Sequence, residues 1–470
     1  MLVLSAHRLS SELGQWRGNT AVYTALADRI RLLVLDGRLP LGTRLPAERE
    51  LAEKLGVSRT TVAAAYASLR GMGYVFSTRG SGSVVGMPGG GAPPPEDNPA
   101  GLLDFSKAAL PAAPQFTEAT ARAVQELPAY LNGSGYDPVG LPRLRQALAD
   151  RYAERGLPTT PQQIMVTLGA QHAISLLART LLERRDSALV EAPSYPHAYE
   201  ALRSAGRRLV PVAVSTGSGW DEDGMEQAFR RARPAIAYVM PDYHNPTGEV
   251  MTPGLRERLL TEAERHDTVV IADETMAELR IDGAEPALPL AAYGPAVLIG
   301  SLGKTVWGGL CIGWIRAEPE LIGRLVQARF SNDLGTPVLE QLIALELMKD
   351  YRRLLGVRAG QLARGRQHLE SLLASALPEW EVPHVNGGLS TWVNLGRPAS
   401  SQLALAARSG GLLLGAGPRF GINGEFERFL RIPFSYPAED TEQAVRILAG
   451  TWAALGPESP SRTSYLPALV

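Results

Sequence analysis

Residues 296–309, AVLIGSLGKTVWGG, combine a short apolar run with a single lysine, Lys304, set among small and apolar residues. The apolar run has the length of a buried strand, and the glycines after it favour a turn. A lysine gains a chemical role when other groups of the right kind lie beside it at the edge of an α/β sheet. The stretch therefore predicts a strand that ends at a functional lysine.

Apolar runs and helical patterns alternate on both sides of this stretch. The runs IMVTL, SALVEAP, AIAYVMP and TVVIADE are separated by segments with apolar residues at helical spacing. Such alternation is typical of an α/β domain with a largely parallel sheet. From RLVQARF onward the chain is more helical, with strands expected at LSTWVNL and LRIPF, which predicts a small C-terminal subdomain.

Residues 86–99, GMPGGGAPPPEDNP, divide the chain. Nine of these 14 residues are Gly or Pro, a composition that sustains neither a helix nor a sheet ladder. The 470 residues are also too many for one compact core. We therefore expect an N-terminal domain over residues 1–86, a flexible linker over 87–103 and a second domain over 104–470.

The charge of the chain is distributed unevenly. The whole sequence has an ordinary globular composition, with 45% hydrophobic residues, 20% charged residues and a net charge of -1. Residues 1–86 hold 11 Lys and Arg against 6 Asp and Glu, a net charge of +5, and the remainder carries -6. A basic N-terminal segment is typical of a nucleic-acid-binding domain.

Three features bear on location. The single cysteine, Cys311, excludes an intramolecular disulfide framework, which fits a reducing compartment. The N-terminus lacks the basic flank and apolar core of a secretion signal. The uncharged run over residues 286–303 is broken by Pro289, Gly294 and Pro295, so it does not resemble a membrane helix. We expect a cytoplasmic protein without a membrane partner.

The N-terminal domain has the pattern of a winged helix-turn-helix. Helical spacing appears in AVYTALADRIRLLVLDGRL, AERELAEKLG and SRTTVAAAYASLRGMG, and two short β runs flank a Gly/Ser turn in YVFSTRGSGSVVG. In this α+β motif the second helix of the helix-turn-helix enters the major groove with its first residues toward the base edges. That helix begins here after Ser58, its expected N-cap.

The side chains at these positions suit DNA. Arg59 is able to hold guanine through two hydrogen bonds, and the neighbouring hydroxyls reach phosphate or base. Arg44 and Arg49 flank the preceding helix, and a glycine at the wing tip allows close approach to a groove. The DNA-contact candidates are Arg44, Arg49, Ser58, Arg59, Thr60, Thr61, Arg79 and Gly80.

The segment LPAERELAEKLGVSRTTVAAAYASL resembles the GntR family of bacterial transcription regulators along its whole length. The resemblance implies double-stranded operator DNA as a partner and carries Arg49, Arg59 and Thr61 over as contacts. The alternative is a basic three-helix module for packing or protein interaction. The length of the match favours DNA.

Polar side chains follow several of the expected strands in the second domain. Asp273 ends TVVIADE, Asn245 follows AIAYVMP, and Tyr195 follows SALVEAP. Gly169 follows IMVTL and opens a helix, whose N-terminus is an anion site. A carboxylate, an amide, an aromatic ring, an anion-binding helix end and Lys304 together describe a pocket for pyridoxal phosphate. Each residue alone has a structural alternative, such as a cap or a solvated side chain.

Pyridoxal phosphate chemistry gives each residue a role. Lys304 forms the Schiff base with the cofactor aldehyde. Asp273 keeps the pyridine nitrogen protonated, and Asn245 bonds the ring hydroxyl. The phosphate is held by Gly169, Ala170 and Ser301.

The set, from about residue 104 to the C-terminus, resembles the fold-type I aminotransferases, which depend on pyridoxal phosphate. The resemblance implies a homodimer with a shared site, in which Tyr136 of YDPVGLPRLR reaches the phosphate of the neighbouring subunit. It also implies that Arg431 of LRIPF grips a carboxylate through two bonds. A GntR-like domain joined to such a domain is the arrangement of the MocR (GabR-type) regulators.

Three departures from the family pattern remove polar contacts to the cofactor. Thr275 stands where a tyrosine is usual, Cys311 where an arginine is usual, and Leu168 and Ala170 where hydroxyl residues are usual. A charge-assisted hydrogen bond contributes about 1.5 to 3 kcal/mol, so we expect weakened pyridoxal phosphate binding. A site with a poor hold on its cofactor is a poor transaminase, which favours a regulator over an enzyme.

The leading hypothesis is a transcription regulator that binds operator DNA and senses pyridoxal phosphate or a small amino compound. One alternative is an active aminotransferase with an accessory DNA-binding segment. Another is a regulator whose second domain has lost the cofactor and only dimerises or binds another ligand. No residue pattern predicts a metal site.

Overall fold

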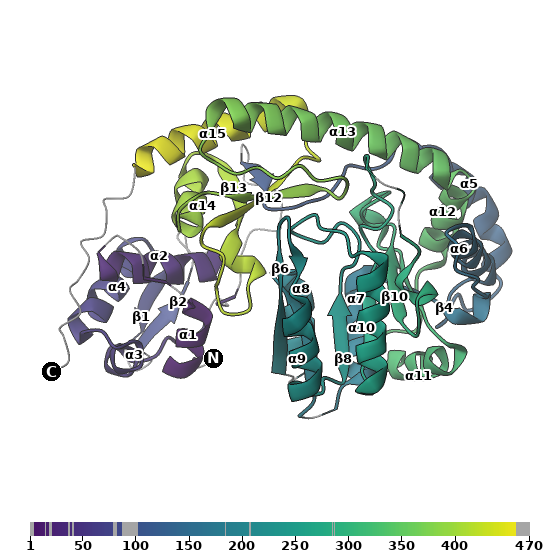
Figure 1. The fold of residues 1–470 in the computed structure, drawn as a ribbon, viewed down its shortest axis with the longest axis horizontal. Helices are drawn as coiled ribbons and strands as arrows, with labels where there is room; N and C mark the ends of the chain where they lie inside the picture. Colours follow the sequence, from purple (N-terminus) through teal and green to yellow (C-terminus); the bar gives the residue numbers. More distant parts are fainter. Residues whose placement is uncertain are drawn as a thin grey trace.

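The computed structural model describes residues 4–14, 16–17, 21–35, 38–39, 42–78, 82–86, 102–183, 185–205, 208–283, 285 and 287–456. Within these ranges the chain forms an N-terminal domain and a larger part made of two subdomains (Figure 1). Most of the linker expected over 87–103 lies outside the described residues. Its last residue is in fact the first of a strand, β3 (Leu103–Phe105).

The N-terminal domain is a winged helix-turn-helix with one helix more than expected. Its elements are α1 (Ala6–Leu13), α2 (Val22–Leu35), α3 (Glu48–Leu55), α4 (Arg59–Gly71), β1 (Val75–Thr78) and β2 (Gly82–Val85). The two strands form the antiparallel wing. Leu26, Ile30, Val62 and Leu69 are buried together between the helices. Helix α1 spans only eight residues and is not among the helices expected from the sequence.

The large subdomain contains a mixed eight-stranded sheet. In spatial order its strands are β4 (Ile164–Thr167), β11 (Gly313–Arg316), β10 (Val297–Ser301), β9 (Val269–Asp273), β8 (Ile236–Val239), β5 (Ser187–Ala192), β6 (Arg208–Ser215) and β7 (Gly219–Trp220). The central strands β10, β9, β8, β5 and β6 are parallel, and β11 and β7 run antiparallel to their neighbours. The largely parallel sheet is confirmed, and the antiparallel β11 explains how the chain passes beside β10 immediately after the Lys304 turn.

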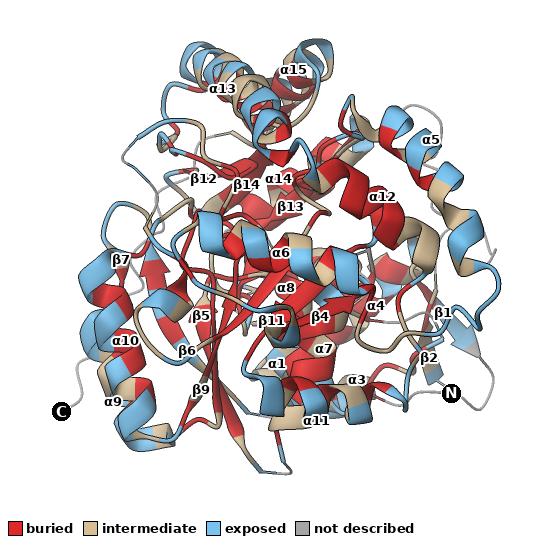
Figure 2. Ribbon diagram, turned by 90° about the vertical axis from the view of Figure 1, so that its right-hand side faces the viewer, coloured by how far each residue is buried: buried red, intermediate tan, exposed pale blue. Residues whose placement is uncertain are grey.

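Helices cover both faces of this sheet, as Figure 2 shows by the buried strands at its centre. On one face α7 (Gly169–Leu181), α8 (Pro196–Ser204) and α11 (Pro319–Arg329) share a core with residues such as Ile271 and Ile299. On the other face the alternate residues Val270 and Leu298 pack against a second group of helices. That group is α5 (Phe116–Glu126), α6 (Pro142–Glu154), α9 (Glu222–Ala232), α10 (Pro253–Arg265) and α12 (Val338–Met348). Burial on both faces requires the continuous apolar strands that the sequence shows.

The C-terminal subdomain contains a four-stranded sheet ordered β12 (Ser390–Asn394), β14 (Phe429–Pro433), β13 (Leu412–Ala416) and β3. Its helices are α13 (Tyr351–Ala376), α14 (Ser400–Ser409) and α15 (Ala438–Leu455). Helix α13 arches from the large subdomain to the C-terminal one (Figure 1). Short 3-10 turns complete the described elements: η1 (Leu127–Tyr130), η2 (Pro161–Gln163), η3 (Leu290–Ala292), η4 (Gly308–Leu310) and η5 (Gly417–Phe420).

A buried ion pair anchors the segment between β8 and α10, which contains Asn245. The guanidinium of Arg256, on α10, is fully buried and donates to both carboxylate oxygens of Asp242, at 2.6 and 3.3 Å. It also donates to the carbonyls of Pro241, Met251 and Leu288. One side chain therefore fixes the path of the backbone on both sides of the Asn245 turn.

We predict that Arg256→Ala lowers the free energy of unfolding by about 3 to 5 kcal/mol, because it leaves the buried carboxylate of Asp242 without its partner. Arg258→Ala is the matched control on the same helix. Arg258 is exposed and pairs with the exposed Glu222, so its loss is expected to cost about 0.5 kcal/mol or less. Urea denaturation measures both, and equal costs for the two variants would contradict the prediction.

Candidate functional site

Lys304 lies in the tight turn that joins β10 to β11. The turn is closed by a bond from the Leu302 N–H to the carbonyl of Ile312 and one from the Gly303 N–H to the Ser301 hydroxyl. The ammonium of Lys304 donates to the carbonyl of Ala108 at 2.7 Å. Desolvation by the surrounding protein, aided by the positive charge of Arg431, lowers the pKa of Lys304 to about 8. A fraction of this amine is therefore a neutral nucleophile near neutral pH.

Asp273 is the last residue of β9, the strand beside β10, and is 3% exposed. The hydroxyl of Tyr238 donates to one of its oxygens at 2.6 Å, and the Thr275 N–H donates to the other at 3.0 Å. Burial raises the pKa of Asp273 above its usual range, and these donors, with the charge of Lys304, oppose that rise. Thr275 therefore supports Asp273 rather than standing apart from the site.

Asn245 and Tyr195 follow β8 and β5, the next two strands of the sheet. Asn245 is 8% exposed, and its Oδ1 has no hydrogen-bond partner within the described part of the chain. Tyr195 caps α8 and is half-buried. Its pKa is raised to about 12 by burial and then by the charge of Asp273. The aromatic ring is thus placed in the electrostatic range of the carboxylate.

Arg431 extends from β14 of the C-terminal subdomain and is 7% exposed. It donates one bond to the Ser106 carbonyl, lies 5.0 Å from the centre of the Phe420 ring, and leaves Nε without a partner among the described residues. Burial and the charge of Arg419 lower the pKa of Arg431 to about 10. A buried guanidinium with unused donors favours an anionic ligand.

The N-terminus of α7 lies beside the end of β10. Gly169 is its first residue and has φ +78°, a conformation that favours glycine. Gly313 pairs with Ser301 and packs so closely on Gly169 and Ala170 that a Cβ on Gly313 would lie 2.6 Å from the Gly169 carbonyl carbon. The first amides of α7 and the Ser301 hydroxyl are therefore neighbours, as an anion site requires.

Two sequence candidates lie apart from this group in the structure. Tyr136 is 69% exposed. Cys311 is exposed, with φ +51°, and its thiol contacts the carbonyl of Gly308 at 3.5 Å. The thiol is turned toward its own turn and supplies no charge at this position.

The structure adds residues that the sequence analysis did not select. Tyr238 holds Asp273, Phe420 lies against Arg431, and the segment at Ser106 and Ala108 accepts bonds from both cations. The tyrosine within the otherwise aliphatic strand AIAYVMP was a usable signal for Tyr238. Carbonyl groups carry no such signal in a sequence.

Pyridoxal phosphate fits these residues. The group needs an amine, an acid for its ring nitrogen, an amide for its hydroxyl and an anion site for its phosphate. Lys304, Asp273, the unpartnered Asn245 and the start of α7 supply them. The fit is weakest at Cys311, because a thiol stands where the family has a positively charged partner for the phosphate.

The surface of the N-terminal domain exposes Arg49, Ser58, Arg59 and Thr60, four of the residues expected to contact DNA. Ser58 caps α4 by accepting from the Thr61 N–H, and its hydroxyl contacts those of Thr60 and Thr61 at 2.7 and 2.8 Å. Arg59 has a side chain 73% exposed and lies 3.8 Å from a Glu48 oxygen. Arg49 is exposed.

Arg44 is half-buried against the wing, where a Cβ on Gly82 would lie 3.4 Å from its Nε. Its packing makes it a brace for the wing as well as a basic group. Arg79 and Gly80, at the wing tip, lie outside the described residues.

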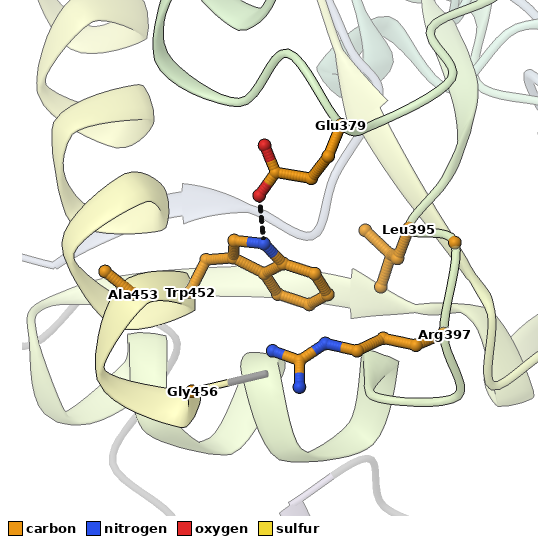
Figure 3. A pocket seen from close by; sticks show the side chains of 7 residues that line it. Glu379, Leu395, Arg397, Trp452, Ala453 and Gly456 are labelled. Atoms are coloured by element: carbon orange, nitrogen blue, oxygen red, sulfur yellow. Dashed lines mark hydrogen bonds between the residues drawn. The ribbon is translucent and has the colours of Figure 1, made fainter. Parts of the chain in front are cut away.

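A separate hollow of about 430 Å³ lies on the C-terminal subdomain, at the end of α15. There Arg397 stacks 4.0 Å over the ring of Trp452, whose indole N–H donates to Glu379 at 2.5 Å (Figure 3). None of its lining residues belongs to the Lys304 group. In the described ranges no cluster of three potential metal ligands and no helix long and apolar enough to cross a membrane is found.

Two family models match the chain. Aminotransferase class I and II matches residues 104–448, and the gntR family of bacterial regulatory proteins matches residues 22–85. The chain belongs to the aminotransferase class I and II family. With its GntR domain it is a transcription regulator of the MocR/PdxR type, as its relatives show.

Several relatives match most of this chain and most of their own length. YdfD of Bacillus subtilis, named as an uncharacterized helix-turn-helix transcriptional regulator, is 27% identical over 90% of this chain and 94% of its own. The pyridoxine biosynthesis regulator PdxR of Corynebacterium glutamicum is 30% identical over 83% of this chain and 87% of its own. The 2-aminoadipate transaminase of Thermus thermophilus is 31% identical over 73% of this chain and 87% of its own.

A solved structure supports the fold of the second domain. LysN, the alpha-aminoadipate aminotransferase of Thermus thermophilus complexed with N-(5'-phosphopyridoxyl)-L-leucine, matches with a TM-score of 0.69 and 29% identity. The match covers 76% of this chain and 93% of LysN. The expected fold-type I architecture of the regulator is therefore confirmed.

We predict that Lys304→Met stabilises the cofactor-free regulator by about 1 to 3 kcal/mol at pH 7, because burial disfavours the lysine ammonium. The pKa of Lys304 is lowered from 10.5 to about 8 in the folded state, so the unfolded chain binds more protons between these values. Wild-type stability therefore rises with pH across that window, and the advantage of the variant shrinks.

Urea denaturation at several pH values measures this difference. Lys54→Met, at an exposed position on α3, is the control and is expected to change stability by about 0.5 kcal/mol or less at each pH. A Lys304→Met advantage that does not change between pH 7 and pH 10 would rule out the titration of Lys304 as its cause.

Proposed function

We propose that this regulator is a cytoplasmic homodimer that binds pyridoxal phosphate on Lys304 and senses a small amino carboxylate through Arg431. The observation that carries the proposal is that the half-buried amine of Lys304 lies within electrostatic range of a buried carboxylate, Asp273, and a buried guanidinium, Arg431, whose Nε has no partner among the described residues. The same chain presents an exposed recognition helix, so occupancy of the pocket has an output on DNA.

When bound, pyridoxal phosphate supplies an aldehyde that bonds reversibly to amines. The residues of the regulator are suited to bind this cofactor. Lys304 offers an amine that is partly neutral near pH 8, and the Ala108 carbonyl orients that amine. Asp273, held by Tyr238 and Thr275, would supply a carboxyl group for the ring nitrogen of the cofactor. The amides at the start of α7 would hold its phosphate.

Sensing is favoured over turnover. Catalysis needs a cofactor held rigidly while protons move, and charge-assisted bonds to its phosphate contribute most of that hold. Cys311 provides no charge, and the hydroxyl group of Thr275 is engaged with Asp273. A site that binds the cofactor weakly and exchanges ligands is better suited to sensing a ligand at equilibrium than to catalysis.

The proposed dimer completes the pocket from outside the chain. Tyr136 is 69% exposed, and Leu131, Trp307 and Leu168 are also exposed apolar residues, with Trp307 and Leu168 close in sequence to the cofactor residues. Exposed apolar residues mark an interaction surface when they form a contiguous patch. In the dimer, Tyr136 of one chain reaches the phosphate region of the other.

The effector class follows from Arg431. Its planar guanidinium matches a carboxylate through two parallel bonds, and its Nε has no partner among the described residues. The effector therefore carries an amine for the cofactor and a carboxylate for Arg431. The amino-acid substrates named for 2-aminoadipate transaminase and LysN belong to this class.

We predict that the purified regulator gains a visible absorbance band on titration with pyridoxal phosphate and that Lys304→Ala abolishes this band, because Lys304 is the amine that bonds the cofactor. Circular dichroism and gel filtration check that the variant stays folded and dimeric. Lys349→Ala removes an exposed amine elsewhere and is expected to keep the band. A band that persists in Lys304→Ala would identify another lysine as the anchor.

We predict that Arg59→Ala weakens binding to a selected operator duplex and relaxes base preference at one position by about 1 to 3 kcal/mol, the range for a bidentate arginine–guanine contact. Fluorescence anisotropy against the operator and single-base variants measures both effects. Arg230→Ala removes the same charge from an exposed site on α9 and serves as the control. Unchanged affinity and selectivity in Arg59→Ala would place base recognition elsewhere.

A further inference from the structure

The N-terminal domain is docked on the C-terminal subdomain through α2, which lies beside α14 (Figure 1). The buried Arg29 of α2 donates from Nη1 to the Ser401 hydroxyl at 3.1 Å and lies 3.6 Å from a Glu427 oxygen. Its Nε donates to the Leu13 carbonyl at 2.9 Å. Leu32, one turn further along α2, is buried with the core of the C-terminal subdomain. A buried charge and an apolar residue thus join the two parts.

Two glycines allow this close approach. Gly14, at the end of α1, has φ +58°, and a Cβ there would lie 1.7 Å from the Asn423 carbonyl oxygen. Gly424 has φ +80°, and a Cβ there would lie 2.3 Å from a nitrogen of Arg29 and 3.3 Å from the Gly14 Cα. Each position accepts only glycine while the domains are docked. The contact is therefore a fitted surface rather than a loose apposition.

Glu427 holds the other side of this contact. One of its oxygens accepts from the Ser401 hydroxyl at 2.6 Å, and the other accepts from the Ser401 N–H at 3.0 Å. Its carbonyl accepts from the Ser400 N–H. Glu427 therefore caps the N-terminus of α14 and presents a negative charge to Arg29 at the same time.

The segment that contains Glu427 begins and ends at the effector pocket. It runs from η5, where the Phe420 ring lies against Arg431, through Asn423, Gly424 and Glu427 into β14 and Arg431 itself. Its start is tied to α14 by a bond from the Gly417 N–H to the Ser400 hydroxyl, at 2.9 Å.

The same segment is also tied to the large subdomain. The Phe420 carbonyl accepts from the Ser194 N–H, beside Tyr195, and from the Tyr199 hydroxyl. The segment, residues 417–431, therefore bridges three parts of the chain: the pocket residues that follow β5, helix α14 and the docked N-terminal domain.

We propose that segment 417–431 couples the effector pocket to the DNA-binding domain, with the Arg29–Ser401–Glu427 contact and the Gly14–Gly424 approach as the output. The inference rests on the proposed function, because it assigns the regulation of the same pocket. A carboxylate bound to Arg431 competes with its contacts to Ser106 and Phe420 and so acts on the start and end of the segment together. When the ligand shifts the segment, the contacts of the segment with Gly14 and Arg29 change as well. The N-terminal domain is either docked or undocked, and the ligand binds these two states with different affinities.

The test compares operator affinity with and without a ligand in the full-length dimer. The probe is N-(5'-phosphopyridoxyl)-L-leucine, which carries both a phosphopyridoxyl group and an amino-acid carboxylate. Calorimetry measures its binding, and anisotropy measures affinity for a duplex selected by the wild-type protein from random DNA. We expect the probe to change wild-type operator affinity about 5-fold or more, as is usual for coupled sites.

Two variants break the contact in different ways. Glu427→Gln removes the charge that faces Arg29 but keeps an oxygen for the Ser401 N–H, so α14 stays capped. Gly14→Ala obstructs docking through its Cβ, and Gly42→Ala is its control, since Gly42 has φ +79° with nothing within 4 Å of a Cβ. We expect Glu427→Gln and Gly14→Ala to bind the probe within about twofold of wild type and to lose most of the operator response. Gly42→Ala keeps the response.

The outcomes distinguish a failure of the proposed function from a failure of the coupling alone. Wild-type protein that does not bind the probe would overturn the proposed function together with the coupling. Wild-type protein that binds and responds, with Glu427→Gln and Gly14→Ala responding equally, would overturn the coupling alone. If Gly14→Ala fails to fold, as judged by its melting curve, the result for Glu427→Gln decides.

Discussion

Asp273 ends β9, Lys304 lies in the turn just after the neighbouring strand β10, and the protein around them disfavours the charged form of each side chain. Opposite charges at the carboxyl ends of β10 and β9 compensate one another only because the parallel sheet sets the strands side by side. The turn after β10, the antiparallel return of β11 and the packing of Gly313 on the start of α7 all serve this placement. The pocket is thus a product of strand order, and residues far apart in sequence acquire a shared electrostatic environment.

Much of this arrangement could be predicted from the sequence because it depends on local patterns. The end of β9 at Asp273, the opening of α7 at Gly169 and the capping of α4 by Ser58 follow from apolar runs, glycine turns and hydroxyl caps. The family resemblance added Arg431, which no local pattern would assign to a pocket built by another subdomain.

What could not be predicted depends on long-range packing. The contacts of Tyr238 with Asp273 and of Lys304 with the Ala108 carbonyl require strand register and loop placement that a single sequence does not fix. The short helix α1 buries only Leu9 and Leu13 and spans eight residues, fewer than the window of about 11 residues over which helical periodicity is read. The docking of α2 on α14 joins residues nearly the length of the chain apart, and only the folded chain reveals it.

The facing glycines at Gly14 and Gly424 have an evolutionary consequence. A helix-turn-helix domain is often regarded as a portable module, free to move between partners through recombination. Here the two surfaces meet backbone to backbone, so an incoming domain with any side chain at the Gly14 position would collide with the Asn423 carbonyl. The two halves must therefore change in step, and a productive gene fusion would have to bring both glycines, or acquire them soon after.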